Sequence, residues 1–316
     1  MRLIESHYEI IPQGKGLEGI YKQIELGARN CYKSENFIKE GSAEKMVDAL
    51  IKRGHGSPLE HGTVYLKITR NSPLNDITYL SSTDAINFYR RNHYSTVVEK
   101  TEDHYNYDYY VTTNYRVLIE NERLDDLKYL CEPTKHHKKR YTVRFVCSRA
   151  IANEIVRHRD NMSYCQESQR YVNYSLDKFG NEITCILPKW VIDRTNDVAE
   201  TIDPLTGYRR DYLMNMPILE AVTKHMVCED RAVANWIDSL KRAESDYFYL
   251  LTDECGLKPQ EARGVLPNDC KTDIIVTGTE TAWKHFFKLR CATTAHPDIR
   301  ELACPLEMEF KIREFI

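Results

Sequence analysis

Arg157–Tyr171 reads RHRDNMSYCQESQRY and is the stretch that decides the fold. It holds three arginines, one histidine, two serines, one glutamate and two glutamines within fifteen residues. The preceding segment, Ser148–Val156, has its apolar residues at helical spacing. Because Asp160–Asn161 is a break signal, Arg157–Arg159 are expected in the last helical turn, and the rest of the stretch is expected to form a loop.

The simplest explanation of these cations is the helix dipole, which favours a positive charge at a helix C-terminus by about 0.3–1 kcal/mol. The helix dipole accounts for one or two of the three consecutive residues Arg157–Arg159. Successive helix residues are about 100° apart in projection, so three in a row cannot share one solvated face. With Arg170 beyond the loop, the pattern favours an extended anionic ligand such as a nucleotide or dinucleotide, because guanidinium groups donate bidentate hydrogen bonds to phosphates.

The spacing resembles the signature of flavin-dependent thymidylate synthases, which is an Arg-His-Arg triplet, a spacer of seven residues, a serine, and Arg-Tyr two residues later. In this chain the serine is Ser168, and Arg170-Tyr171 follow it. The chain departs from the signature in one respect, because eight residues separate Arg159 from Ser168. Three further segments match the family in order along the chain: the loop around His55, Arg263–Pro267, and the aromatic helix Thr277–Arg290.

The strand and helix patterns, taken with this resemblance, predict an α+β fold with a mixed or antiparallel sheet and flanking helices. The clearest element is a long amphipathic helix between Val233 and Leu251. No repeat or linker divides the chain, so residues 1–316 are expected to form a single domain. Minimal members of the family run more directly between the strands that flank residues 71–140, so this region is interpreted as an elaboration of the common core.

Within the elaboration, alternating residues from Tyr109 to Ile119 predict a strand, and Leu124–Leu130 predicts a short helix. The basic run His136–Arg140 is expected to be a solvated turn rather than a binding patch. Thr195–Arg210 is expected to be an exposed loop. The last segment, Leu306–Ile312, alternates in a way that leaves helix and strand both open.

The resemblance implies an enzyme of nucleotide biosynthesis that methylates dUMP reductively to dTMP. It implies that 5,10-methylenetetrahydrofolate gives the carbon, that NADPH gives the reducing equivalents, and that bound FAD relays both. The protein would then supply placement and electrostatics, while the cofactor carries out the redox chemistry. The family forms homotetramers with active sites shared between subunits, and a homotetramer is expected here.

Residue by residue, the resemblance gives the catalytic roles to Arg290 and His55. Arg290 would sit at the uracil and favour ionisation at N3, because a fixed guanidinium stabilises negative charge on the ring and makes C5 nucleophilic. His55 and Ser57 would face the flavin. The other residues expected to hold FAD are Arg157, His158, Arg159, Gln166, Thr279, Thr281 and His285. The residues expected to hold dUMP are Glu154, Arg157, Gln166, Glu167, Ser168, Gln169, Arg170, Arg263 and Arg290.

Metal binding, hydrolysis and covalent catalysis are alternative chemistries for the same residues. The loop around His55 and His61 matches no standard zinc spacing, so no metal site is predicted. Ser168 lacks the surroundings of a nucleophile elbow, which disfavours hydrolysis with His158 as base. Cys165 could act as a covalent nucleophile, but an unreactive loop thiol is the favoured interpretation. The family often has Asn and Arg where this chain has Thr279 and Thr281, and Asn where His285 stands; Thr281 cannot supply a charge.

Composition restricts the class of protein. The net charge of −3 disfavours a general nucleic-acid binder, which is normally basic. No apolar run approaches the roughly 18 residues of a membrane span, and the first residues lack a secretory signal, so a cytoplasmic enzyme is expected. The ten cysteines are scattered and are expected to be reduced thiols. Two rival functions stay open: a noncatalytic nucleotide- or RNA-binding module, and a flavin reductase that does not methylate.

Overall fold

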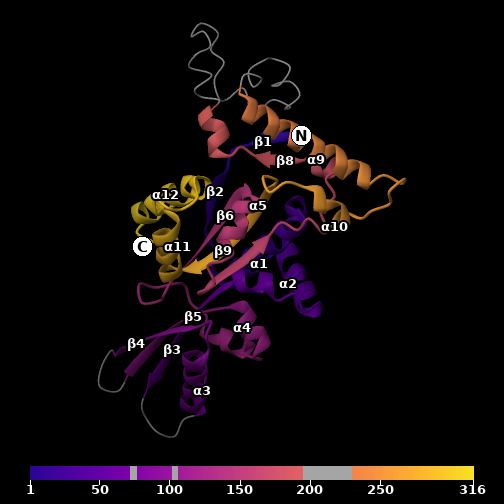
Figure 1. Ribbon diagram of the computed structural model, residues 1–316. Coiled ribbons are helices and arrows are strands. Elements are labelled where there is room, and N and C mark those ends of the chain that lie inside the picture. Colours follow the sequence, from indigo (N-terminus) through magenta and orange to yellow (C-terminus); the bar gives the residue numbers. More distant parts are fainter. Residues whose placement is uncertain (72–76, 102–105, 195–229) are drawn as a thin grey trace.

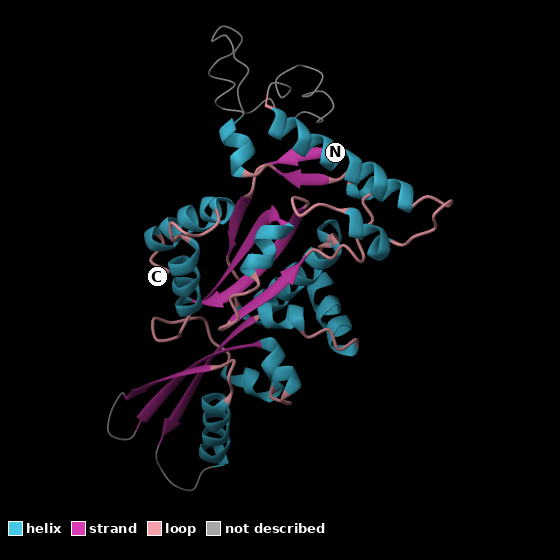
Figure 2. Cartoon of the chain, in the orientation of Figure 1, coloured by secondary structure: helices cyan, strands magenta, loops and turns pink. Residues whose placement is uncertain are grey.

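The computed structural model describes residues 1–71, 77–101, 106–194 and 230–316 (Figure 1). The described residues form three sheets with helices packed around them, as Figure 2 shows. The predicted α+β class is confirmed: two sheets are antiparallel, and the third, two-stranded sheet is parallel. The expected loop Thr195–Arg210 lies outside the described residues. Within them, no helix is both long and apolar enough to cross a bilayer.

A four-stranded sheet lies at the centre, and every neighbouring pair in it is antiparallel. Its strands, in spatial order, are β2 (His7–Ile11), β6 (Arg140–Ser148), β9 (Lys271–Thr279) and β7 (Met162–Gln166). Side chains alternate between the two faces of a strand, so one face can be apolar and the other polar. On β6, Val143, Phe145 and Cys147 all belong to the apolar core on one face.

Three helices cover the apolar face: α5 (Arg149–Ile155), α11 (Glu280–Arg290) and α12 (Pro297–Ile312). Trp283 and Phe286 of α11 and Phe310 of α12 are buried against one another, with ring centroids of Trp283 and Phe310 5.3 Å apart. The segment whose pattern left helix and strand open is therefore helical. The burial of Leu306 and Phe310, four residues apart, reflects helical packing on this sheet.

The opposite face of the sheet is polar although it is buried. It presents Thr142, Asp273 and Thr277 to helix α1 (Gly16–Tyr32), behind which lies α2 (Ser42–Lys52), and to the short 3-10 helix Ser57–His61. Thr277 Oγ1 lies 2.8 Å from the Nδ1 atom of His61 and 2.8 Å from the hydroxyl oxygen of Thr142. Hydrogen bonding of this kind offsets the cost of burying polar groups.

The region interpreted as an elaboration, residues 71–140, adds two strands to β3, which precedes it, and the three form a second, antiparallel sheet in the order β3 (Thr63–Asn71), β5 (Asn106–Asn114), β4 (Thr96–Thr101). Helix α3 (Ile77–Arg91) and the short 3-10 helix Leu124–Tyr129 pack against it. The three strands and α3 lie at the end of the molecule opposite α9 (Figure 1). We call residues 63–129 the inserted sheet unit.

The predicted strand Tyr109–Ile119 is wrong beyond Asn114. The chain turns there into helix α4 (Tyr115–Glu120), because the Asn114 side chain caps it by accepting a hydrogen bond from the backbone N–H of Val117 at 3.2 Å. Helix α4 also packs on the loop that precedes β3. A Cβ atom at Gly56 would lie 2.7 Å from the Nε atom of Arg116, so a side chain there would displace the flexible end of Arg116.

A third, two-stranded sheet pairs β1 (Arg2–Ile4) with β8 (Thr184–Ile186) in parallel. The predicted long amphipathic helix is confirmed as α9 (Arg231–Leu250), which buries Val233, Ile237, Leu240 and Tyr247. Beyond it lies α10 (Pro259–Ala262). The remaining short 3-10 helices are Glu35–Phe37, Asp177–Phe179 and Arg263–Val265.

Candidate functional site

The signature stretch differs from its expected conformation in two ways. Helix α5 ends at Ile155, so Arg157–Arg159 lie in the turn after the helix rather than in its last turn. Asn161, at φ 53°, directs the chain back toward the sheet, where Met162–Gln166 form strand β7 instead of a loop. Pairing along β9 stabilises this strand, and tertiary pairing of this kind overrides a weak local preference.

The three consecutive residues Arg157–Arg159 do point in different directions. Arg157 and Arg159 are exposed, whereas His158 between them is buried. The hydroxyl of Tyr164 on β7 donates a hydrogen bond to the His158 carbonyl and holds the turn against the strand. Two guanidinium groups are therefore presented outward from a fixed backbone.

Arg290, at the end of α11, is fixed against this turn by three hydrogen bonds. Its Nε–H donates to His158 Nε2 at 2.8 Å, one Nη donates to the Glu154 carboxylate at 2.5 Å, and the other donates to the Glu154 carbonyl at 2.8 Å. The Arg290 side chain is 17% exposed and that of Glu154 is 30% exposed. A guanidinium has five N–H bonds, so two remain for a ligand. We call Glu154, His158 and Arg290 the arginine clamp.

His158 is neutral in this arrangement. Burial, followed by the positive charge of Arg290 and the neighbouring His285, lowers the pKa of His158 to about 4. Since its Nε2 accepts from Arg290, the ring proton lies on Nδ1. The His158 and His285 rings lie 6.0 Å apart, which brings a fourth predicted residue to the edge of the clamp.

The buried histidines predict an acid-dependent loss of stability. Burial lowers the pKa of His61 to about 3, so between about pH 6.5 and pH 4 the unfolded chain binds protons at His61 and His158 that the folded chain does not. We expect the free energy of unfolding to fall by about 3 kcal/mol from pH 7 to pH 5.

Urea titrations of the wild type and of His61→Asn should show a shallower pH slope in the variant. Exposed His7→Asn is the control and should keep the wild-type slope; an unchanged slope in His61→Asn would contradict the assignment.

Of the next four signature residues, Gln166 ends strand β7, and Glu167, Ser168 and Gln169 follow it in the loop. Gln166 Nε2 lies 3.3 Å from Thr272 Oγ1, and the Ser168 hydroxyl accepts from the Arg170 backbone N–H at 3.3 Å. Glu167 and Gln169 are buried. These four side chains therefore have defined positions, and those of Gln166 and Ser168 are partly open to solvent.

A buried charge cluster beneath Glu167 has no counterpart in the sequence analysis. Lys271 Nζ lies 3.0 Å from Glu167 and 2.6 Å from Asp273, and Arg144 lies 3.3 Å from Asp273. Lys33 also pairs with Asp273, and its Nζ is 3.6 Å from Glu167. The cluster holds three cations and two carboxylates. Burial lowers the pKa of Lys271 to about 8, against the opposing effect of Glu167. In the sequence, only Lys271 and Asp273, two charged residues directly before the apolar run Ile274–Val276, pointed to it.

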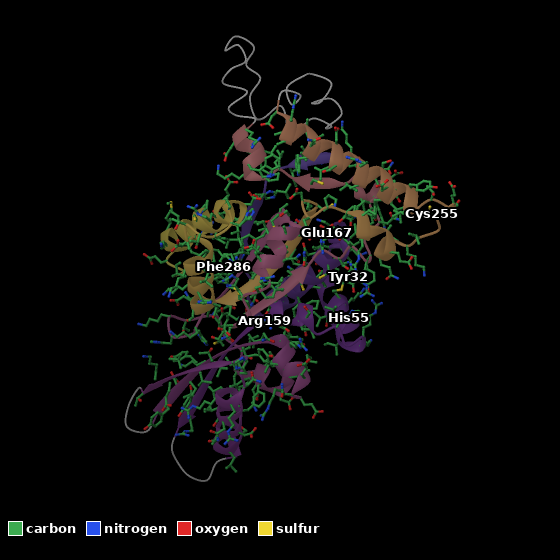
Figure 3. All side chains as sticks on the ribbon, in the orientation of Figure 1. Tyr32, His55, Arg159, Glu167, Cys255 and Phe286 are labelled. Atoms are coloured by element: carbon green, nitrogen blue, oxygen red, sulfur yellow. The ribbon has the colours of Figure 1, made fainter. Side chains whose placement is uncertain are left out.

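The remaining predicted residues are distributed around the arginine clamp and the charge cluster at Glu167. The Ser57 hydroxyl donates to the Tyr164 carbonyl at 3.1 Å, so the His55 loop contacts β7. Thr279 caps α11, whereas Thr281 and His55 are exposed. The contacts of the described residues do not join Arg170 or Arg263 to the arginine clamp, and both side chains are exposed. Figure 3 shows Arg159 where the inserted sheet unit meets the central sheet, with Glu167 and Tyr32 farther toward α9.

Comparison with known proteins decides the family. A family model described as "Thymidylate synthase complementing protein" matches residues 132–312, which include α5, the signature, β9 and α11. The chain belongs to this family. The resemblance drawn from the signature is thereby confirmed.

Curated relatives of the family are named flavin-dependent thymidylate synthase. Those of Mycobacteroides abscessus and Geobacter sulfurreducens are 31% and 32% identical over 156 residues, and that of Clostridium tetani is 30% identical over 164. These alignments cover 49%, 49% and 52% of this chain and 51%, 49% and 55% of the relatives. The chain spans about half the length of the curated relatives it matches. A crystal structure of the UMP/dUMP methylase PolB from Streptomyces cacaoi bound with 5-Br dUMP gives a TM-score of 0.38 at 16% identity, covering 100% of this chain and 93% of that one.

The donor set of this family member suits an anionic dinucleotide. Arg157 and Arg159 are exposed and form no ion pair with the part of the chain that the structure describes. Arg140, which the sequence analysis placed in a solvated turn, instead lies in strand β6, and its guanidinium donates to three neutral oxygens. Cations without acidic partners fit phosphate groups. Among the residues described, no cluster of three or more His, Cys, Asp or Glu side chains could hold a metal ion.

Proposed function

We propose that this chain catalyses the reductive methylation of dUMP to dTMP. FAD is the cofactor, NADPH the reductant and 5,10-methylenetetrahydrofolate the carbon donor. The observation that carries the proposal is the arginine clamp, which fixes a partly exposed guanidinium beside the signature turn and leaves two of its N–H bonds unused. Membership of the family and the names of the curated relatives support it. A cytoplasmic location and a single domain over residues 1–316 belong to the same proposal.

The clamp has a definite electrostatic task in this reaction. Neutral His158 and the Glu154 carbonyl hold the guanidinium without adding negative charge, whereas the Glu154 carboxylate orients it and offsets part of its charge. A uracil placed at its two remaining N–H bonds would ionise more readily at N3, because a preorganised positive charge stabilises the anion. Negative charge on the ring makes C5 a better nucleophile. FAD, when bound, supplies the redox chemistry that the side chains lack.

The other residues in the proposal bind and orient the ligands. Exposed Arg157 and Arg159 lie beside the clamp and would hold the flavin phosphates, with Arg157 also near dUMP. Arg170 and Arg263 would hold the phosphate of dUMP, and Gln166–Gln169 would line its sugar and base. Because the described contacts leave Arg170 and Arg263 apart from Arg290, we propose that subunits of a homotetramer complete each site.

Product formation tests the proposal directly. Purified protein supplied with dUMP, methylenetetrahydrofolate, NADPH and FAD should release tritium from C5-labelled dUMP and form dTMP. A flavin reductase would oxidise NADPH and leave the tritium in place, and a binding module would do neither. Omitting FAD after its removal from the protein is the control and should stop dTMP formation.

Cys165→Ala is expected to keep kcat within a few-fold of the wild type. The Cys165 thiol is buried on β7, and its contact with Cys31 and burial hold its pKa well above the usual range, so it is not a thiolate at neutral pH. The measurement is dTMP formation under saturating substrates. Complete loss of activity in a folded variant would show that Cys165 acts covalently.

A further inference from the structure

A narrow crevice separates the signature turn from the inserted sheet unit. Its lining includes Arg159 and Thr279, Arg140, and His93 and Tyr94 of the inserted sheet unit. Its volume is about 40 Å³, which has room for a phosphate group rather than a ring system. The crevice therefore joins the region interpreted as an elaboration to two residues expected to hold FAD.

The charge balance of the crevice favours an anion. The Arg140 guanidinium donates to the Glu60 carbonyl at 2.9 Å, to the Thr63 hydroxyl at 3.3 Å and to the Ser163 hydroxyl at 3.0 Å. The Glu60 carboxylate, which also lines the crevice, pairs instead with Arg116 at 2.6 Å. Burial lowers the pKa of Arg140 to about 10, so it is still charged at neutral pH. Of its five N–H bonds, three are used.

An ordered turn holds the aromatic side chains at the edge of the crevice. The Asn92 carboxamide oxygen accepts from the Tyr94 backbone N–H and the Ser95 hydroxyl, both at 2.9 Å. The Ser95 hydroxyl lies 2.8 Å from that of Thr113, which anchors the turn on β5. Tyr94 is nevertheless 63% exposed, and its ring lies 5.3 Å from that of His93. An exposed aromatic ring on a fixed turn is suited to stacking on a base.

The distance along α11 matches the length of a dinucleotide. Thr279 at the start of the helix lines the crevice, and Arg290 at its end belongs to the arginine clamp. Eleven helical residues span roughly 16 Å. Arg159, which follows clamp residue His158 in the chain, also lines the crevice, so a dinucleotide with its flavin ring near the clamp can place its second half in the crevice.

We propose that the inserted sheet unit and Arg140 form the binding site for the adenosine diphosphate half of FAD. The phosphates lie on Arg140 and Arg159, and the adenine stacks on Tyr94. This inference rests on the proposed function, because it assumes that the flavin ring lies next to the uracil that the arginine clamp binds. It assigns a role to a region that minimal members of the family lack.

Flavin binding to the apoprotein tests the assignment without any turnover. Quenching of flavin fluorescence gives the Kd for FAD and for FMN, which lacks the adenosine. Tyr94→Ala is expected to weaken FAD binding about 10-fold, in line with about 1–3 kcal/mol for base stacking, and to leave FMN binding unchanged. Tyr94→Phe should bind FAD as the wild type does. Tyr249→Ala removes a tyrosine that is 53% exposed on α9 and should change neither Kd.

Two results would overturn the inference. The first is that Tyr94→Ala binds FAD with an affinity within twofold of the wild type. The second is that Tyr94→Ala loses FAD and FMN affinity equally, which would place Tyr94 at the flavin ring or in a structural role. If the wild type forms dTMP and either result is obtained, only this inference fails. If the wild type binds no FAD at all, the proposed function fails with it.

Discussion

Replacing Arg290 with alanine is expected to lower kcat for dTMP formation about 100- to 1000-fold while FAD remains bound. Removing a preorganised donor that stabilises charge in the transition state has an effect of this size. Arg290 is well placed for such a role, because three hydrogen bonds to Glu154 and His158 fix its guanidinium and two N–H bonds are left over. The measurement is single-turnover dTMP formation together with the flavin absorbance of the purified variant.

Lys288→Ala is the matched control, because Lys288 is exposed on the same helical turn and lies outside the clamp. Its kcat should equal that of the wild type. Arg290→Lys should be intermediate, since lysine keeps the charge but loses the planar fork. Wild-type turnover in Arg290→Ala would rule out the N3 role, and loss of bound FAD would show that Arg290 holds the cofactor instead.

Asp273→Asn is expected to lower the free energy of unfolding by about 3 kcal/mol. Asp273 is fully buried at the centre of the charge cluster and pairs with Lys33, Lys271 and Arg144. Its removal leaves Glu167 as the only carboxylate among three cations. Removing one partner of a buried ion pair is costly because the remaining charge is uncompensated, and here the partial exposure of the cations moderates the cost.

Urea denaturation of Asp273→Asn measures this cost. Exposed Asp193→Asn, which breaks an ion pair with Lys189 on the surface, is the control and should change stability by less than about 1 kcal/mol. Adding Lys33→Gln to Asp273→Asn leaves two cations, instead of three, around the one remaining carboxylate. The double variant should therefore recover part of the lost stability. Equal stabilities of Asp273→Asn and Asp193→Asn would show that the cluster is solvated in solution.

The elements with strong local patterns were predictable from the sequence. The long helix α9 follows from apolar residues at period 3.6, and β6 follows from alternation. The family followed from the signature, even with its longer spacer. The roles of the site residues stay predictions, because the described contacts place them without testing what they bind.

Failures of local prediction occurred where distant segments decide the conformation. Met162–Gln166 were expected in a loop, but β9 offers them a partner strand far away in the sequence. The strand expected through Ile119 ends at Asn114, because a side-chain cap outweighs the alternation that continues beyond it. Arg140 was assigned to a solvated turn, yet pairing with Thr279 draws it into the sheet.

By itself, the sequence determined the family, the α+β class and the residue types available for anion binding, because these depend on local spacing and on a motif within one stretch. Only the tertiary structure decided which of those residues meet. It joined Arg290 to Glu154 and His158 across more than one hundred residues, assembled the cluster around Asp273, and brought Tyr94 of the inserted sheet unit and Arg159 to the same crevice. The physical reason is that hydrogen bonds and ion pairs depend on proximity in space, and sheet pairing between distant segments creates that proximity.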